Sequence, residues 1–317
     1  MFGPPSARAG GPPRMSPPGG MKLFPGKGAG GPPGGALKGL QGKLGPDFAK
    51  AKTPGDKAAL SKKLTDVGQG TQNDPVTQFT AFQEAVRTGI ESGDVSAVFG
   101  AIESACKLFN LDEHAEKAQI LKEMFGESSG EGSEQLYSGA SEAAQRAAAH
   151  DDYDNAREIA SDAYNYADKN NDREEKEELA ELKQYLQAAA QQLQSALAAE
   201  KTLATKPDDT ASNLSIGRYL ALVKQEWEKG LPYLAKGGDV PLALTARDDL
   251  TAAKEPAKQQ AMGDAWWAAS ADEQGKHEAD SMKRRAGYWY AKSLGGLSGP
   301  TRAKVEKRLA EIKALGR

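Results

Sequence analysis

The side chains that proteins use most often as nucleophiles, proton carriers or metal ligands are few and widely spaced in this sequence. The histidines are His114, His150 and His277, and Cys106 is the single cysteine. No second His or Cys stands at the short spacing that a zinc site requires. The sequence therefore predicts no catalytic residue, no metal site and no cofactor, and the histidines are interpreted as single surface residues.

Three other features invite a chemical interpretation, and each has a simpler structural one. The run "HDDYDN" at 150–155 lacks the glycine and the terminal glutamate of a calcium loop, so its aspartates are interpreted as a helix cap. The run "GKGAGG" at 26–31 would need a glycine in place of Met21 and a hydroxyl in place of Gly28 to be a phosphate-binding loop. Cys106 lies on an apolar helix face, which favours a buried structural thiol.

The largest aromatic side chains gather towards the C-terminus. Trp266, Trp267 and Trp289 lie within residues 261–292, and Trp227 lies shortly before them. Such rings could form an exposed stacking platform or fill the core of a helical fold. We predict that most of them fill the core, because Gly263 and Ala286 would let two helices approach and leave space for rings between hairpins. Adjacent Trp266 and Trp267 point about 100° apart on a helix, so only one of them is expected to face the core.

The elements that position these residues are predicted to be helices. No stretch alternates apolar and polar residues like a strand, whereas apolar residues recur at helical spacing from residue 75 onwards. The predicted helices are 76–92, 95–109, 112–125, 134–149, 153–169, 172–201, 210–224, 226–236, 239–252, 256–269, 275–294 and 300–315. Short polar turns between them imply antiparallel packing of neighbours.

The N-terminal part differs in composition and charge. Residues 1–46 hold 14 of the 35 glycines and 10 of the 17 prolines, too little apolar surface for a packed core. We therefore predict a disordered basic arm and linker over 1–75, with one short helix near 58–67. Helical hairpins ending in a long charged helix are predicted for 76–205, and a helical domain for 206–317. Residues 1–63 carry a net charge of +9 and the remainder −12.

Small residues recur where paired helices would cross. The stretch "SGASEAAQRAAAHDDYDNAREIASDAYNYA" resembles a tetratricopeptide hairpin, and two looser copies follow. The fold class that this predicts is all-α, a solenoid of stacked antiparallel hairpins. The residues predicted to form the hairpin core of the looser copies are Gly217, Trp227, Tyr233, Gly263, Trp266, Ala286, Trp289 and Tyr290.

Three stretches resemble a more specific group of sequences. They are "NLSIGRYLALVKQEWEKGLPYLAKGGD", "MGDAWWAAS" and "RRAGYWYAKSLGGLSGPTRAKVEKRL". Together they are similar to a C-terminal helical region that recurs in large planctomycete proteins, and the resemblance extends over about 76–315. It implies a tetratricopeptide-like region attached to varied modules, and it brings no catalytic residues with it. Neither an attached module nor the export signal common in that family is recognisable in the sequence, so we expect neither.

These observations favour a non-catalytic helical scaffold that binds a protein or peptide partner. Exposed side chains predicted to contact the partner are Trp267, Arg284, Arg285 and Tyr288, with Arg284 and Arg285 pairing acidic residues such as Asp264. The alternative is a polyanion- or nucleic-acid-associated protein that uses residues 1–63. An enzyme with an unrecognised site is a third hypothesis. No signal peptide or membrane span is apparent, which predicts a cytoplasmic protein, while the family resemblance leaves an extracytoplasmic one open.

Overall fold

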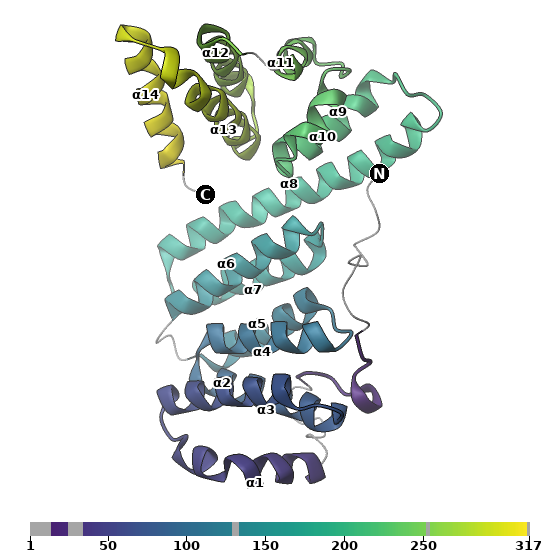
Figure 1. Cartoon of the computed structure of the whole chain (residues 1–317), viewed down its shortest axis with the longest axis vertical. Helices are drawn as coiled ribbons and strands as arrows, with labels where there is room; N and C mark the ends of the chain where they lie inside the picture. The colour runs from purple at the N-terminus through teal and green to yellow at the C-terminus, as the bar shows by residue number, and fades with distance from the viewer. Residues whose placement is uncertain (1–13, 25–33, 129–132, 252–253, 316–317) are drawn as a thin grey trace. The chain divides into compact units, whose positions relative to one another are not determined.

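The fold is all-α. The computed structural model describes residues 14–24, 34–128, 133–251 and 254–315. Over these residues the chain forms helices α1 to α14 with short 3-10 or π turns, and the only strand-like pairing is an isolated parallel bridge between Met15 and Phe109 (Figure 1). The predicted all-helical class is therefore confirmed for the part of the chain described.

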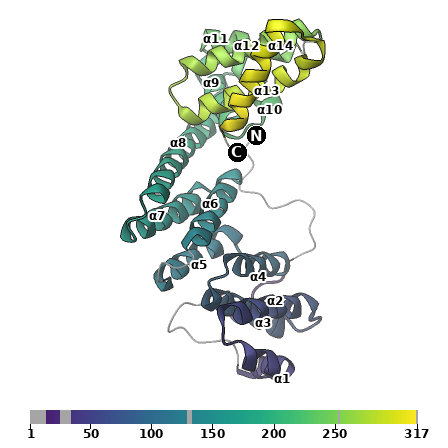
Figure 2. The same cartoon turned by 90° about the vertical axis from the view of Figure 1, so that its left-hand side faces the viewer.

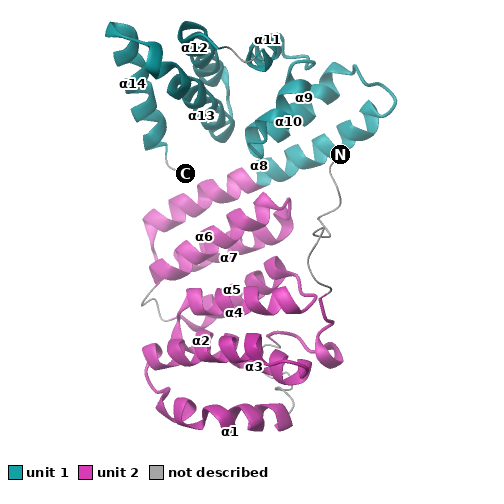
Figure 3. Ribbon diagram, in the orientation of Figure 1, with its two compact units in different colours: residues 1–2, 187–317 teal, residues 3–186 magenta. Residues whose placement is uncertain are grey.

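The chain divides into two compact units, coloured separately in Figure 3. The N-terminal unit ends at Leu186, and the C-terminal unit comprises Gln187–Arg317. The division falls inside α8 (Arg173–Leu203), whereas the sequence analysis placed a boundary after this helix, at 205/206.

Seven helices make up most of the N-terminal unit. In two perpendicular views α1 lies at one end, followed by α2 with α3, then α4 with α5, then α6 with α7 (Figures 1 and 2). Their bounds are α1 (Gly34–Lys50), α2 (Pro54–Gly70), α3 (Pro75–Ser92), α4 (Val95–Leu108), α5 (Glu113–Glu127), α6 (Ser133–Ala149) and α7 (Tyr153–Lys169). Aspartates begin four of them by accepting a hydrogen bond from a first-turn N–H: Asp74, Asp94, Asp112 and Asp152. The capping role predicted for "HDDYDN" is thus confirmed at Asp152.

An aromatic cluster forms the core around α3. Phe79 and Phe82 are fully buried against Phe109, with ring centroids 4.9 and 6.4 Å apart in edge-on geometry. Gln83, also on α3, donates from its side-chain amide to the carbonyl of Lys22, at 2.7 Å. Residues 14–24 thereby pack onto this core, and Leu23 is fully buried.

Helix α1 corrects the predicted arm over 1–75, whereas α2 contains and extends the short helix predicted near 58–67. Residues 34–50 and 54–70 are helical and part of the N-terminal unit, while 1–13 and 25–33 lie outside the described residues. Glycine and Pro46 argued against a helix at α1, but Leu40 is fully buried, and tertiary packing of this kind outweighs weak helix propensity. A capping box between Thr53 and Asp56 begins α2.

The C-terminal unit contains the remaining helices and a π-helical turn. Their bounds are α9 (Thr210–Arg218), η2 (Tyr219–Val223), α10 (Trp227–Leu234), α11 (Val240–Leu250), α12 (Pro256–Asp272), α13 (Lys276–Ser293) and α14 (Gly299–Ala314). The core is formed by buried residues of these elements, among them Leu222, Leu231, Leu234, Leu242, Met262, Trp266, Met282, Trp289, Tyr290 and Val305.

Glycines allow the helices of this unit to approach closely. A Cβ atom added to Gly217 would lie 2.6 Å from the backbone nitrogen of Leu234, and one added to Gly263 would lie 2.5 Å from the Tyr290 ring. A side chain at Gly217 would force the facing helix to move, and one at Gly263 would displace the Tyr290 ring. The two hairpins, α9–α10 and α12–α13, are therefore built around the glycines that the sequence analysis selected.

Candidate functional site

The most chemically distinctive site is a buried carboxylate in the C-terminal unit. Asp249, on α11, is only 3% exposed. It accepts hydrogen bonds from the indole nitrogens of Trp266 (2.6 Å) and Trp289 (2.8 Å). Arg285 donates to the same carboxylate from Nε (2.8 Å) and from a terminal nitrogen (2.5 Å). One carboxylate on α11 thus ties together two indoles and an arginine from α12 and α13.

Aromatic rings surround the arginine of this site. The guanidinium carbon of Arg285 lies 4.6 Å from the centre of the Tyr288 ring and 5.3 Å from that of Trp227. Trp227 in turn meets Trp266 edge-on, at 5.1 Å. Cation–π contacts and a bidentate ion pair together fix the guanidinium. Because its charge is neutralised and its side chain is 13% exposed, Arg285 is a structural cation rather than a free one.

A second polar network lies on α12, α13 and α14. Asp264 accepts a hydrogen bond from the Tyr290 hydroxyl (2.7 Å) and pairs with Lys304 (3.0 Å) and Arg308. Arg308 also stacks on Trp267, 4.9 Å from its ring centre. Burial tends to raise the pKa of Asp264, but the hydrogen bonds from Tyr290 and Lys304 and the charge of Arg308 outweigh it, so this pKa is lowered. The carboxylate therefore stays ionised.

The residues selected for the hairpin core lie at different depths. Trp266, Ala286 and Tyr290 are fully buried, and Trp289 is 3% exposed. Trp227 is only partly buried and packs against the core from its edge. Tyr233 is also partly buried, since its neighbours Leu231 and Leu234 take the inward positions of α10.

The residues selected for partner contact are mostly occupied within the molecule. Arg285 pairs with an acidic residue as predicted, although with Asp249 rather than Asp264. Trp267 is partly buried beneath Arg308. Arg284 is partly buried and also has an interaction within the molecule. Tyr288 is 44% exposed. Of the four, Tyr288 alone is therefore largely exposed to solvent.

The sequence analysis missed Asp249 and the proximity of two histidines. Asp249 lies in an ordinary amphipathic helix, and nothing local indicates which of the aspartates on α11 turns inward. His114 and His150 are not isolated, because their ring centres lie 5.2 Å apart. Burial lowers the pKa of His114, the charge of His150 adds to this, and the nearby carboxylate of Asp152 opposes it. The pair joins the start of α5 to the α6–α7 turn.

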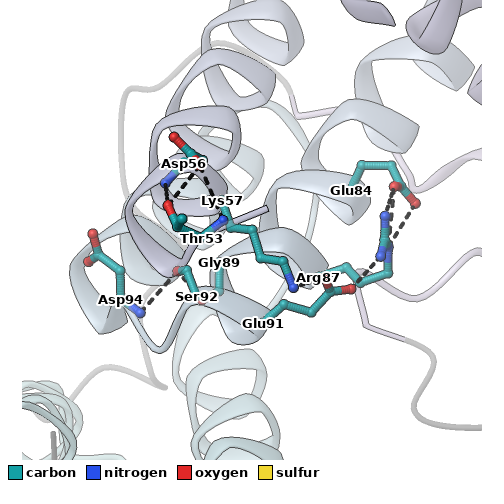
Figure 4. A network of polar contacts seen from close by, with 9 residues as sticks. All are labelled: Thr53, Asp56, Lys57, Glu84, Arg87, Gly89, Glu91, Ser92 and Asp94. Carbon is teal, nitrogen blue, oxygen red and sulfur yellow. Dashed lines mark hydrogen bonds and ion pairs between the residues drawn. The ribbon is translucent and has the colours of Figure 1, made fainter. Parts of the chain in front are cut away.

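Polar contacts also join α2 to α3 in the N-terminal unit, as Figure 4 shows. Arg87 lies between Glu84 and Glu91, with nitrogen–oxygen distances of 2.6 and 2.5 Å. Lys57 of α2 reaches Glu91 at 3.0 Å. Glu84 is almost fully buried, so Arg87 supplies the charge that a buried carboxylate needs.

The remaining chemistry is limited. Burial raises the pKa of Cys106 to about 12, so its thiol stays protonated and unreactive in the folded protein. Among the residues described, no three His, Cys, Asp or Glu side chains converge as a metal site would require. In the same residues, no helix has the length and apolar character to span a membrane.

Known proteins offer no guide to these sites. No family model, curated protein or solved structure matches the chain. The resemblance to the planctomycete helical region therefore stays a prediction.

Proposed function

We propose that this protein is a non-catalytic helical scaffold and that a partner protein binds to α11. The observation that carries the proposal is where exposed apolar side chains occur. Among the described residues, the large apolar side chains classed as exposed are Val76, Val240, Leu244, Leu250 and Tyr288. Three of these five lie on the single short helix α11. Clustered exposed apolar residues mark interaction surfaces in soluble proteins.

The geometry of α11 explains why these side chains stay outside. Val240 and Leu244 are one helical turn apart and share a face. They are 65% and 52% exposed. The opposite face carries Leu242 and Asp249, which are buried in the core. Since the Asp249 bonds fix the rotation of the helix, Val240 and Leu244 are held towards solvent.

The chemistry of this surface defines the kind of partner. Val240 and Leu244 form a small apolar centre, and exposed Arg247 and Asp248 border it. An apolar centre with a polar rim suits the apolar stripe of an amphipathic helix. Tyr288 remains a proposed additional contact on a separate helix.

Buried and half-buried polar side chains of the C-terminal unit are already bonded to one another, which supports a scaffold rather than an enzyme. Asp249 and Arg285 are saturated by each other and by indole donors, and Asp264 is held by Tyr290 and Arg308. These groups therefore stabilise helix packing. We further propose that α6–α7, α9–α10 and α12–α13 are tetratricopeptide-like hairpins; the close approaches at Gly217 and Gly263 support this.

Site-specific photo-crosslinking tests the proposal. The full chain carries a photoreactive amino acid at Leu244 or, as control, at Val76, an exposed valine on α3. In cells that naturally contain the protein, we expect a discrete adduct from position 244 that Val240→Asp abolishes, and none from position 76. Equal adducts from both positions would contradict the proposal. An adduct of twice the chain mass would show self-association instead of a partner.

A further inference from the structure

We propose that α1 is a binding site for the phosphodiester backbone of nucleic acid, through Lys38, Lys43 and Lys50 and with Lys52 just beyond the helix. This site lies in the N-terminal unit and is independent of the partner surface on α11. It narrows the basic segment to one helix, since the structure separates the lysines of residues 34–63 into two groups. The lysines of one group form ion pairs with carboxylates of the same chain, and those of the other group do not.

The lysines of α2 belong to the neutralised group. Lys57 pairs with Glu91 at 3.0 Å, as Figure 4 shows. The other two pairs are Lys62 with Asp94 at 3.8 Å and Lys63 with Asp47 at 2.5 Å. These three cations are therefore poorly placed to attract a further anion.

The lysines of α1 belong to the free group. Lys38, Lys43, Lys50 and Lys52 are exposed, and within the described ranges no carboxylate lies at ion-pair distance from any of them. The pKa of the Asp74 carboxyl is lowered mainly by hydrogen bonds with Thr77. The charge of Lys43 lowers it further, by a smaller amount. Four positive charges are thus left facing water.

Their arrangement spreads the charges along α1 and over more than one of its faces. Helix α1 is kinked at Leu44, whose backbone is not helical (φ −112°, ψ 18°), so Lys50 lies beyond the kink. Before the kink, at about 1.5 Å rise and about 100° rotation per residue, Lys38 and Lys43 lie about 7.5 Å apart along the axis and about 140° apart around it. Between them, Gly39 and Gly42 have no neighbouring atom within 4 Å of a built Cβ. A flexible chain of phosphates that crosses the helix between Lys38 and Lys43 can therefore approach the backbone closely and reach both ammonium groups.

The composition of this face favours nucleic acid over an acidic protein. Protein interfaces have an apolar centre and are depleted in lysine, whereas nucleic-acid interfaces are polar and positively charged. The outer face of α1 offers lysine and glycine, and its Leu40 is buried. Lysine binds phosphate as a point charge and does not read bases. We therefore expect binding that depends on salt and not on base sequence.

The test compares two triple variants of the full chain that remove the same charge. Lys38→Gln/Lys43→Gln/Lys50→Gln removes free lysines, and Lys57→Gln/Lys62→Gln/Lys63→Gln removes paired ones. Fluorescence anisotropy with labelled oligo(dT) of twenty nucleotides measures affinity between about 30 and 200 mM salt. Circular dichroism confirms that each variant is folded. A labelled duplex and a poly-glutamate competitor complete the experiment.

We expect the α1 variant alone to lose affinity. Each lost phosphate contact lowers the steepness of log K against log salt by about 0.7, so losing three lowers it by about 2. Near 0.1 M salt this corresponds to about 100-fold weaker binding. Duplex should respond in the same way with a slightly larger slope change. Equal losses in both triple variants, or none in the α1 variant, would overturn the proposal. So would poly-glutamate competing as well as oligo(dT), which would indicate an acidic protein partner.

Discussion

Replacing Asp249 by alanine tests whether the buried carboxylate holds the C-terminal unit together. The substitution leaves the Arg285 guanidinium and the indole nitrogens of Trp266 and Trp289 without their acceptor. Removing one partner of a buried ion pair costs about 3–5 kcal/mol, and each unsatisfied donor costs about 1–3 kcal/mol. These costs overlap, because Arg285 is 13% exposed and can turn towards water. We therefore expect a loss of about 4 kcal/mol.

Tryptophan fluorescence during urea unfolding is the suitable assay. The four tryptophans all lie within residues 187–317, so this signal reports the C-terminal unit alone. With a slope of about 2 kcal/mol per molar urea, the midpoint for Asp249→Ala should fall by about 2 M. Exposed Asp248, the residue directly before Asp249, is the matched control. Asp248→Ala should change the free energy of unfolding by less than about 0.5 kcal/mol.

A double variant separates the ion pair from the packing. In Asp249→Leu/Arg285→Met both charges are gone, and only the two indole donors remain unsatisfied. Relative to Asp249→Ala, we expect about half of the lost stability to return. Removing both charges leaves no unpaired arginine in the core. If Asp249→Ala costs less than 1 kcal/mol, or if the double variant is less stable than Asp249→Ala, the reasoning about this site is refuted.

Three further changes probe other parts of the fold. Gly217→Ala should cost about 2–3 kcal/mol in urea unfolding, because its Cβ would meet the backbone of Leu234, whereas Gly295→Ala, with no neighbour within 4 Å, should cost little. Burial lowers the folded pKa of His114 below 6.5, so its stabilisation is present above pH 6.5 and lost as pH falls through the folded pKa. Unfolding followed by circular dichroism at pH 7.5 and 5.5 should show this loss, and His114→Gln should reduce it. Cys106, with a pKa of about 12, should react with a thiol reagent at pH 8 only after urea is added; rapid labelling without urea would contradict its burial.

The sequence predicts helices best where local signals agree. The helix expected over 153–169 has those bounds in the structure, because Asp152 caps it and its apolar spacing is regular. The helix α1 escaped prediction because its glycines and Pro46 dominate the local preference. Leu37, Leu40, Leu44 and Phe48 recur at helical spacing and were the available signal. Tertiary burial of Leu40 decided the outcome.

The sequence predicts the buried rings of the candidate site but not the acidic residue that joins them. Rings and small residues at crossing positions indicated the buried side of α12 and α13, and Trp266 and Tyr290 lie there. Which acid would meet Arg285 depends on the rotation of α11, which no local pattern fixes. Adjacent Arg284 and Arg285 differ by about 100° on the helix, so the sequence does not show which one turns inward. Asp249 could be found only from the assembled fold.

The most direct test of the central claim is hydrogen exchange at the indole nitrogens, followed by NMR. If tryptophans and Asp249 form the buried core of the C-terminal unit, the Nε1–H signals of Trp266 and Trp289 should be protected from exchange. Both should lose that protection together in Asp249→Ala. Rapid exchange of both indoles in the unaltered protein would contradict the account.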